Sequence, residues 1–161
     1  MRRLVHLSLL VSFGIVLHII ETFIPLPIHI PGAKLGLANI VTLLALVIYG
    51  FKYGLVVSIM RCLVSSLITG SISGLIYSLS GAIISLIMMF LALYYGSKVF
   101  SLIGVSIIGA QFHILTQISI ASIILQNLGI FLYLPFLMIV SLFTGYFVGL
   151  TSGFTYKILH K

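Results

Sequence analysis

The sequence predicts an all-α integral membrane protein, folded as a single domain with six transmembrane helices. Of its 161 residues, 61% are hydrophobic and only 6% are charged. The mean hydropathy is +1.38. So little charge cannot cover the surface of a soluble protein, so lipid must be the solvent for most of the chain.

Acidic side chains are almost absent. Glu21 is the one acidic residue against eight Lys and Arg residues, and the formal net charge is +7. Catalysis by paired carboxylates, aspartate-rich magnesium sites and Ser-His-Asp triads are therefore excluded within one chain. Cys62 is the single cysteine, so the chain has no intrachain disulfide and no cysteine metal cluster. These counts favour a protein that binds and moves a molecule over an enzyme.

The N-terminal half contains three apolar segments. Leu4–Ile24 has the roughly 20 residues that a spanning helix needs, and prolines between positions 25 and 31 end it. No Ala-x-Ala-type cleavage site follows, so we interpret this segment as a retained helix and not as a signal peptide. Leu35–Gly50 and Tyr53–Ile68 are shorter, as is possible where other helices shield part of a span. The Gly- and Ser-rich stretch Gly70–Gly74 then predicts a break.

The C-terminal half contains three longer segments. Leu75–Tyr95 precedes a predicted turn at Gly96–Lys98. Phe100–Leu125 and Ile130–Tyr156 exceed the length of a span, so we expect them to tilt, bend or protrude. Pro135 is expected to mark such a bend.

The positively charged residues predict the orientation. They stand at the ends of apolar runs, as membrane anchors do, and not in a patch that would bind nucleic acid. With the N-terminus inside, only Lys34 falls on the outer side, and Arg61 lies within a span. We therefore expect both termini in the cytoplasm. The residues on the cytoplasmic side are then Arg2, Arg3, Lys52, Lys98, Lys157 and Lys161.

The outer loop 25–34 reads PLPIHIPGAK. Its prolines stiffen the backbone, while its glycine permits a turn. A stiff loop of this length suits a lid or a wall of a binding site. A simple connector between two helices is the alternative.

Arg61 lies at the middle of the third predicted helix. A charge there costs at least ~2.5–3.5 kcal/mol on insertion scales, so it needs a partner. One interpretation is an ion pair with Glu21, the only acid in the chain. The other is that Arg61 binds an anionic ligand together with Lys34. One acid cannot neutralise both cations, which favours an anionic substrate.

Other polar residues could complete such a site. His113 and Gln117 lie four residues apart on one face of the fifth helix. His113 either forms a hydrogen bond to a neighbouring helix or contacts substrate; with no second ligand at suitable spacing, we predict no metal site and no cofactor. The predicted substrate-binding residues are Lys34, Asn39, Arg61, Tyr77, His113 and Gln117.

Small residues recur at a spacing of four on two helices. Such stripes let helices approach closely in lipid. They serve either packing within the chain or docking of another membrane protein. The candidate docking residues are Ser8 and Ser12 on the first helix, and Ser141, Gly145, Gly149 and Gly153 on the sixth.

Two motifs carry a resemblance to a known family. They are PGAKLGLANIVTLLALVIYG at Pro31–Gly50 and SLSGAIISLIMM at Ser78–Met89, with the arginine-bearing helix and Gly70 between them. This pattern, from about Leu7 to Gly149, resembles the bacterial membrane family called heptaprenyl diphosphate synthase component I, or Gx transporters. That family is similar to the substrate-binding S components of energy-coupling factor (ECF) vitamin transporters.

The resemblance implies six helices with both termini inside and a ligand cavity in the outer half. The loops between helices one and two, three and four, and five and six would cap this cavity. It also implies docking on a transmembrane coupling protein driven by two cytoplasmic ATPases. S components dock through an Ala-x-x-x-Ala-like motif on the first helix, where this chain has Ser8 and Ser12.

Three functional hypotheses follow. The first is a substrate-binding subunit of an ECF-type importer in the bacterial cell membrane, which captures a small organic anion, isoprenoid-related compounds being candidates. Partners would hydrolyse ATP, because the chain has no GxxxxGK[ST] loop. The second is a non-catalytic membrane subunit in heptaprenyl diphosphate or quinone biosynthesis, since prenyl synthases need aspartate-rich motifs. The third is a membrane scaffold without a ligand.

Overall fold

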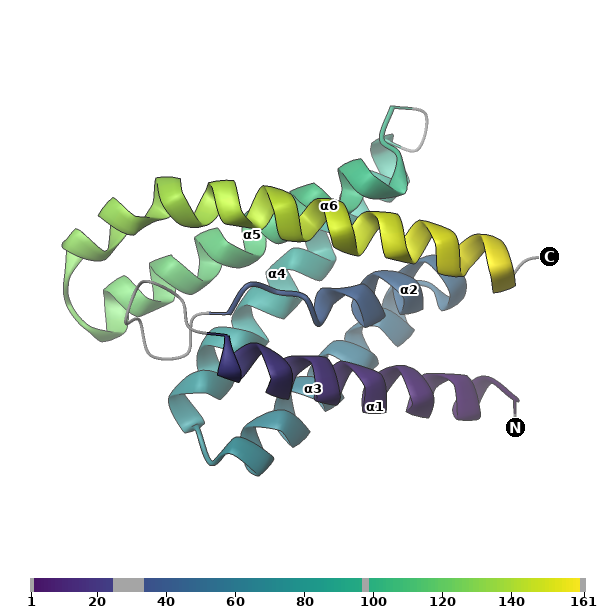
Figure 1. The fold of residues 1–161 in the computed structure, drawn as a ribbon, viewed down its shortest axis with the longest axis horizontal. Helices are drawn as coiled ribbons and strands as arrows, with labels where there is room; N and C mark the ends of the chain where they lie inside the picture. Colours follow the sequence, from purple (N-terminus) through teal and green to yellow (C-terminus); the bar gives the residue numbers. More distant parts are fainter. Residues whose placement is uncertain (1, 25–33, 97–98, 160–161) are drawn as a thin grey trace.

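The computed structural model describes residues 2–24, 34–96 and 99–159. Within these ranges it contains helices and no strand, which confirms the all-α prediction. Figure 1 shows the helices packed side by side as a bundle. In chain order they are α1 (Arg2–Phe23), α2 (Asn39–Tyr49), α3 (Phe51–Thr69), α4 (Ile72–Gly96), α5 (Leu102–Ile124), the 3-10 helix η1 (Leu128–Tyr133) and α6 (Leu134–Leu159).

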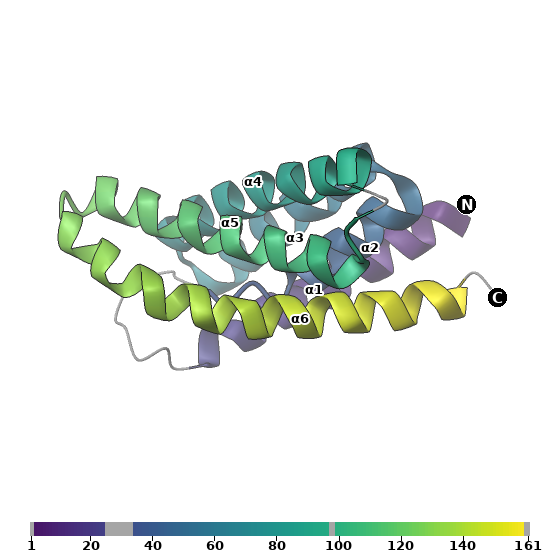
Figure 2. The same cartoon turned by 90° about the horizontal axis from the view of Figure 1, so that it is seen from above.

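Both chain ends lie at the same end of the bundle, as Figures 1 and 2 show. The α2–α3 junction at Gly50 is at that end too, and η1 lies at the opposite end. Helices that run up and down in turn produce this arrangement. We call the two ends the terminal end and the η1 end.

Five helices in the described ranges are long and apolar enough to cross a membrane. The exception is α2, which corrects the prediction that Leu35–Gly50 is a helix throughout. Residues 34–36 have no regular secondary structure, residues 37–38 form a turn, and the helix begins only at Asn39. Its 11 residues rise about 16 Å, roughly half of a hydrocarbon core.

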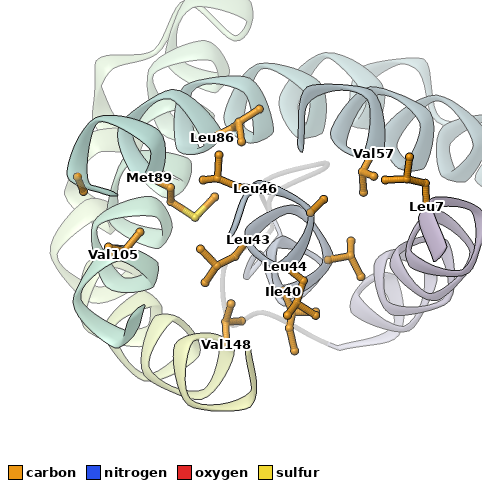
Figure 3. Close-up of a cluster of buried hydrophobic side chains, with 13 residues drawn as sticks. Leu7, Ile40, Leu43, Leu44, Leu46, Val57, Leu86, Met89, Val105 and Val148 are labelled. Carbon is orange, nitrogen blue, oxygen red and sulfur yellow. The ribbon is translucent and has the colours of Figure 1, made fainter. Parts of the chain in front are cut away.

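The short helix α2 forms the centre of the core. All eight residues from Asn39 to Leu46 are buried. Figure 3 shows its leucines pointing outward in several directions, towards Val57 of α3, Leu86 of α4 and Val148 of α6. A helix enclosed by others must be apolar on nearly every face, and it need not span the bilayer itself.

Large apolar side chains cover the outside of the bundle. On α1, Leu4 is 72% exposed and Phe13 is 52% exposed, and on α6 Phe143 is 64% exposed. A soluble protein rarely exposes apolar surface so continuously. This surface is what hydrocarbon solvent requires, and it agrees with the membrane-length helices.

The predicted break at Gly70–Gly74 is confirmed, but it is tighter than expected. Gly70 ends α3 in the left-handed region with φ +65°, where glycine is favoured, and its N–H donates to the carbonyl of Ser66. The Ser71 hydroxyl then accepts from the N–H of Gly74 at 3.0 Å, so α4 begins at Ile72.

Pro135 does not bend the middle of a helix, contrary to our expectation. It is the second residue of α6, directly after η1. A proline costs nothing in the first turn, because the N–H it lacks would have no partner within the helix. The change from 3-10 to α geometry takes place here instead.

Candidate ligand-binding site

The buried polar site is built around Arg61, which lies mid-way along α3 and is 2% exposed. Its Nη2 donates to Oδ1 of Asn39 at 2.7 Å. Asn39 is the first residue of α2, and it is also buried. The structure thus brings together two predicted site residues that are 22 positions apart. Arg61 Nε and Asn39 Nδ2 have no hydrogen-bond partner in the described part of the chain.

The fifth helix contributes a second pair of predicted residues. Oε1 of Gln117 accepts from the backbone N–H of Lys34 at 3.1 Å, and its Nε2 lies 3.0 Å from Nε2 of His113. For the amide to donate in this contact, the His113 Nε2 must be unprotonated, so a neutral ring carries its proton on Nδ1. The amide of Gln117 therefore joins α5 to the segment that leads into α2.

Glu21 also holds this segment. Its carboxylate accepts a hydrogen bond from the N–H of Leu37, and the side chain is buried. In the described ranges, no hydrogen bond or ion pair joins Glu21 directly to Arg61 or Lys34. The predicted Glu21–Arg61 pair is therefore not a direct contact, because each group has found a neutral partner. The charges still lie close enough to act on one another through space.

Lys34 is buried just outside the helices, at the start of the segment 34–38. Burial lowers the pKa of its ammonium group from 10.5 to about 8, and the nearby charge of Glu21 opposes that shift. At neutral pH the side chain still carries its charge. The site therefore holds two buried cations, Lys34 and Arg61, against one carboxylate.

His18 is a site residue that the sequence analysis missed. It lies on α1, is 2% exposed, and neither ring nitrogen has a hydrogen-bond partner among the residues described. Its ring lies within electrostatic reach of Lys34, Arg61 and His113. The signal in the sequence was its position three residues before Glu21, which places both on one face of the helix.

Three glycines, also missed, make room for these side chains. A Cβ at Gly81 would lie 2.9 Å from Nδ1 of His113, and one at Gly14 would lie 3.2 Å from Cδ of Arg61. At Gly36 the backbone has φ +83°, and a Cβ would lie 3.0 Å from Nδ2 of Asn39. The polar side chains thus pack directly against backbone, which only glycine allows.

Tyr77 was also predicted to line the site, but it takes part in none of these polar contacts. It is 2% exposed and lies in an apolar cluster near the η1 end, with Ile114, Ile118, Ile130 and Leu137 among its members. Its ring therefore packs with apolar side chains next to the polar residues of α5.

The small-residue stripe of α6 is used mostly within the chain. A Cβ at Gly145 would lie 2.9 Å from Cα of Ile107, and one at Gly149 would lie 2.6 Å from Cα of Ile103. Ser141 is buried. Gly153 differs, because a Cβ there would meet nothing within 4 Å.

Three of the candidate docking residues, Gly153, Ser8 and Ser12, are not buried between helices. Gly153 lines a groove of about 340 Å³ between α5 and α6 at the terminal end, with Lys157 at its rim. On α1, Ser8 and Ser12 are both exposed, and the hydroxyl of Ser8 donates to the carbonyl of Val5. These positions remain available for contact with another protein or with lipid.

The fold and the site define a class of protein: an all-helical protein with membrane-length apolar helices and a buried, cation-rich polar site. Within the described ranges, no three His, Cys, Asp or Glu side chains gather as metal ligands would. A family model described as heptaprenyl diphosphate synthase component I matches residues 10–155, and the chain belongs to this family. This confirms the resemblance seen in the two sequence motifs. No curated protein and no solved structure matches the chain.

Proposed function

We propose that this protein is a membrane-embedded binding subunit that captures an organic anion in its polar site. The observation that supports this most strongly is the imbalance of charge around Arg61. The one hydrogen-bond partner of its guanidinium in the described chain is the neutral amide of Asn39, and the one carboxylate nearby, Glu21, accepts from a backbone N–H.

A bound anion would remove this imbalance. A guanidinium has five N–H donors, and the bond to Asn39 uses one of them. Burying a cation without a counter-charge is costly, and more so within a membrane. Arg61 and Lys34 together would offer a ligand two positive charges in a dry site, where charge-assisted hydrogen bonds are strong.

The position of the site suits capture from outside the cell. Glu21 is near the end of α1 that points away from the termini, and Lys34 follows it after the outer loop. The loop expected to act as a lid, 25–34, lies outside the described residues except for Lys34. Arg3 is in the first turn of α1, Lys52 in the first turn of α3 and Lys157 in the last turn of α6, so all three belong to the terminal end. By the positive-inside rule, we infer that this end faces the cytoplasm of a bacterial cell.

Transport would then need partners. In the ECF-type arrangement, a transmembrane coupling protein and two cytoplasmic ATPases would supply the energy. The exposed face of α1 around Ser8 and Ser12 is our candidate for docking, because small side chains permit close helix contact. Gly145 and Gly149 are no longer candidates, since they are buried against α5.

The family match favours a second candidate function. The protein would be a non-catalytic membrane subunit in heptaprenyl diphosphate synthesis, and the polar site would hold a diphosphate ligand near a soluble synthase. A scaffold without any ligand is a weaker alternative, because it would leave two buried cations, Arg61 and Lys34, with one carboxylate between them.

Native mass spectrometry of the gently purified protein tests the proposal. We expect a stoichiometric organic anion on the wild type that is lost in Arg61→Gln, which keeps an amide donor for Asn39 but removes the charge. Met60→Ala, at a lipid-facing neighbour that is 42% exposed, is the matched control and should retain the anion. Bulk lipid alone, indifferent to Arg61, would refute capture.

Co-purified proteins separate the two candidates. A coupling protein with two ATPases would support the importer. A prenyl diphosphate synthase would support the biosynthetic subunit instead. Either partner should still co-purify with Arg61→Gln, since the Arg61 side chain is buried inside the bundle.

A further inference from the structure

The groove between α5 and α6 at the terminal end is separate from the polar site. It has a volume of about 340 Å³, and none of the polar-site residues lines it. At Gly149 the two helices are in close contact, since a Cβ there would lie 2.6 Å from Cα of Ile103. One turn further along α6, a Cβ at Gly153 would meet nothing within 4 Å. Because α5 begins at Leu102, the last turns of α6 extend beyond it, and the groove opens there (Figure 2).

The groove is apolar along its walls and cationic at its rim. Four apolar side chains form the walls: Leu102, Ile103, Leu150 and Phe154. Gly153 lies between them without a side chain, and Lys157, which is exposed, follows one turn later. Such a surface is complementary to an amphipathic molecule that has an apolar chain and a negatively charged end.

The charge of Lys157 has no acidic side chain to pair with at this end of the bundle. Glu21 is the only acidic residue in the sequence. It lies roughly 28 Å along α1 from Arg2, which is at the terminal end. The first turn of α5, which also lines the groove, adds the partial positive charge of a helix N-terminus. The charge of the rim therefore favours an anion from another molecule.

A phospholipid fits this groove better than a helix of another protein does. A helix about 10 Å across occupies on the order of 400 Å³ per turn, so the groove would hold less than one turn. Helices in a membrane also have no hydrophobic drive to associate, so apolar walls alone would not recruit one. By the orientation inferred above, the rim faces the cytoplasmic leaflet, whose anionic lipids attract lysines near the membrane surface.

We propose that this groove binds an anionic phospholipid, with one acyl chain over Gly153 and the head group at the ammonium of Lys157. The lipid chain would continue the packing between α5 and α6 where the contact at Gly149 ends. The proposal does not rest on anion capture at Arg61, because the two sites share no residue. Each can fail without the other.

Native mass spectrometry tests the head group. The full chain is released from nanodiscs that contain equal amounts of phosphatidylglycerol and phosphatidylcholine. We expect the wild type to retain about fivefold more phosphatidylglycerol, the factor that one lysine near an anionic surface produces. Lys157→Gln should retain the two lipids equally.

Lys52→Gln is the matched control for this measurement. Lys52 is an exposed lysine at the same end of the bundle, but it does not line the groove. Its variant should keep the preference for phosphatidylglycerol. Equal retention of both lipids by the wild type, or the same loss in both variants, would show that Lys157 holds no head group at this site.

Photo-crosslinking tests the position of the acyl chain. Phosphatidylglycerol with a diazirine on its chain should label α6 between Leu150 and Phe154. Gly153→Leu should abolish this labelling without lowering the melting temperature, because its side chain fills space that is open in the wild type. Phe154→Ala removes one wall of the groove and should weaken the labelling. It is the second variant if Gly153→Leu does not fold.

A second groove provides an internal control. It lies between α2 and α4 at the same end, has a volume of about 300 Å³, and has no charged side chain among the described residues that line it. Phosphatidylglycerol and phosphatidylcholine probes should label it alike, and Gly153→Leu should not change that. If phosphatidylglycerol labels α4 and not α6, the lipid site is wrongly placed. If Gly153→Leu leaves the labelling of α6 intact and releases a co-purified protein, the groove docks that protein and the lipid assignment is wrong.

Discussion

Arg61 Nη2 lies 2.7 Å from Oδ1 of Asn39, so the buried charge of α3 is bonded to the first residue of the central helix α2. This contact holds the start of α2 against α3. It also leaves the positive charge of Arg61 uncompensated by its direct partner, because an amide oxygen orients the guanidinium without neutralising it. The electrostatic properties of the site follow from that choice of partner.

Replacing the Asn39 amide by a carboxylate should place a negative charge next to Arg61, and so favour the unliganded protein over the anion complex. We predict that Asn39→Asp raises the melting temperature of the unliganded protein, because a charge-assisted bond replaces a neutral one. The same change should weaken anion binding about tenfold or more, since Arg61 is then neutralised internally. Thermal unfolding and titration of one preparation measure both effects.

Asn39→Leu is the control for this pair of effects. It removes the acceptor of Arg61 altogether, so we expect a loss of roughly 1–3 kcal/mol in the free energy of unfolding. If Asn39→Asp were also destabilising and left anion binding intact, Arg61 would not be short of a counter-charge.

Lys34 makes ligand binding depend on pH. Its ammonium has a pKa of about 8 in the folded protein, lowered by burial, while the charges of Glu21 and Cys62 oppose the shift and that of Arg61 adds to it. Above pH 8 the side chain loses the charge that would hold an anion. We therefore predict that the dissociation constant rises as the pH passes through 8, in titrations from pH 6.5 to 9.5.

The stability of the unliganded protein should change in the opposite sense. Between pH 8 and 10.5 the unfolded chain binds more protons at this residue than the folded chain does. Stability must then rise with pH in that window, because the cost of burying the charged ammonium disappears. Lys34→Met should flatten both profiles; a variant with the wild-type pH dependence would show that another group titrates.

Gly81 makes space for the imidazole of His113. We predict that Gly81→Ala destabilises the protein by about 1–3 kcal/mol, since the new Cβ would lie 2.9 Å from the ring and something must shift. The ring is in contact with Gln117, which binds the backbone of Lys34, so anion affinity should fall as well. Adding His113→Ala should restore the stability but not the affinity. A double variant as unstable as Gly81→Ala would contradict this account.

Two glycines of α6, four residues apart, allow a matched comparison. At Gly149 a Cβ would lie 2.6 Å from Cα of Ile103, and backbone cannot move aside as a side chain can. Gly149→Ala should therefore lower the free energy of unfolding by at least about 1–3 kcal/mol. Gly153→Ala meets nothing within 4 Å and should be neutral or slightly stabilising, as alanine favours helices. Equal effects in thermal unfolding would refute the close α5–α6 contact.

Much of this protein followed from local properties of its sequence. Apolar windows predicted the helices, and the glycine at position 70 predicted the break that ends α3. The charge count showed that Arg61 and Lys34 could not both be neutralised by Glu21. Such features can be read from a sequence because hydrophobicity, helix-breaking residues and charge are properties of single residues and their neighbours.

Only the tertiary structure decided which groups meet. It shortened the second helix, because α2 is enclosed by other helices and does not need to span lipid by itself. It bonded Arg61 to Asn39 and Glu21 to the N–H of Leu37, and it turned His18 inward. These outcomes depend on how each helix rotates and how closely backbones approach, which is settled by packing between residues far apart in the chain.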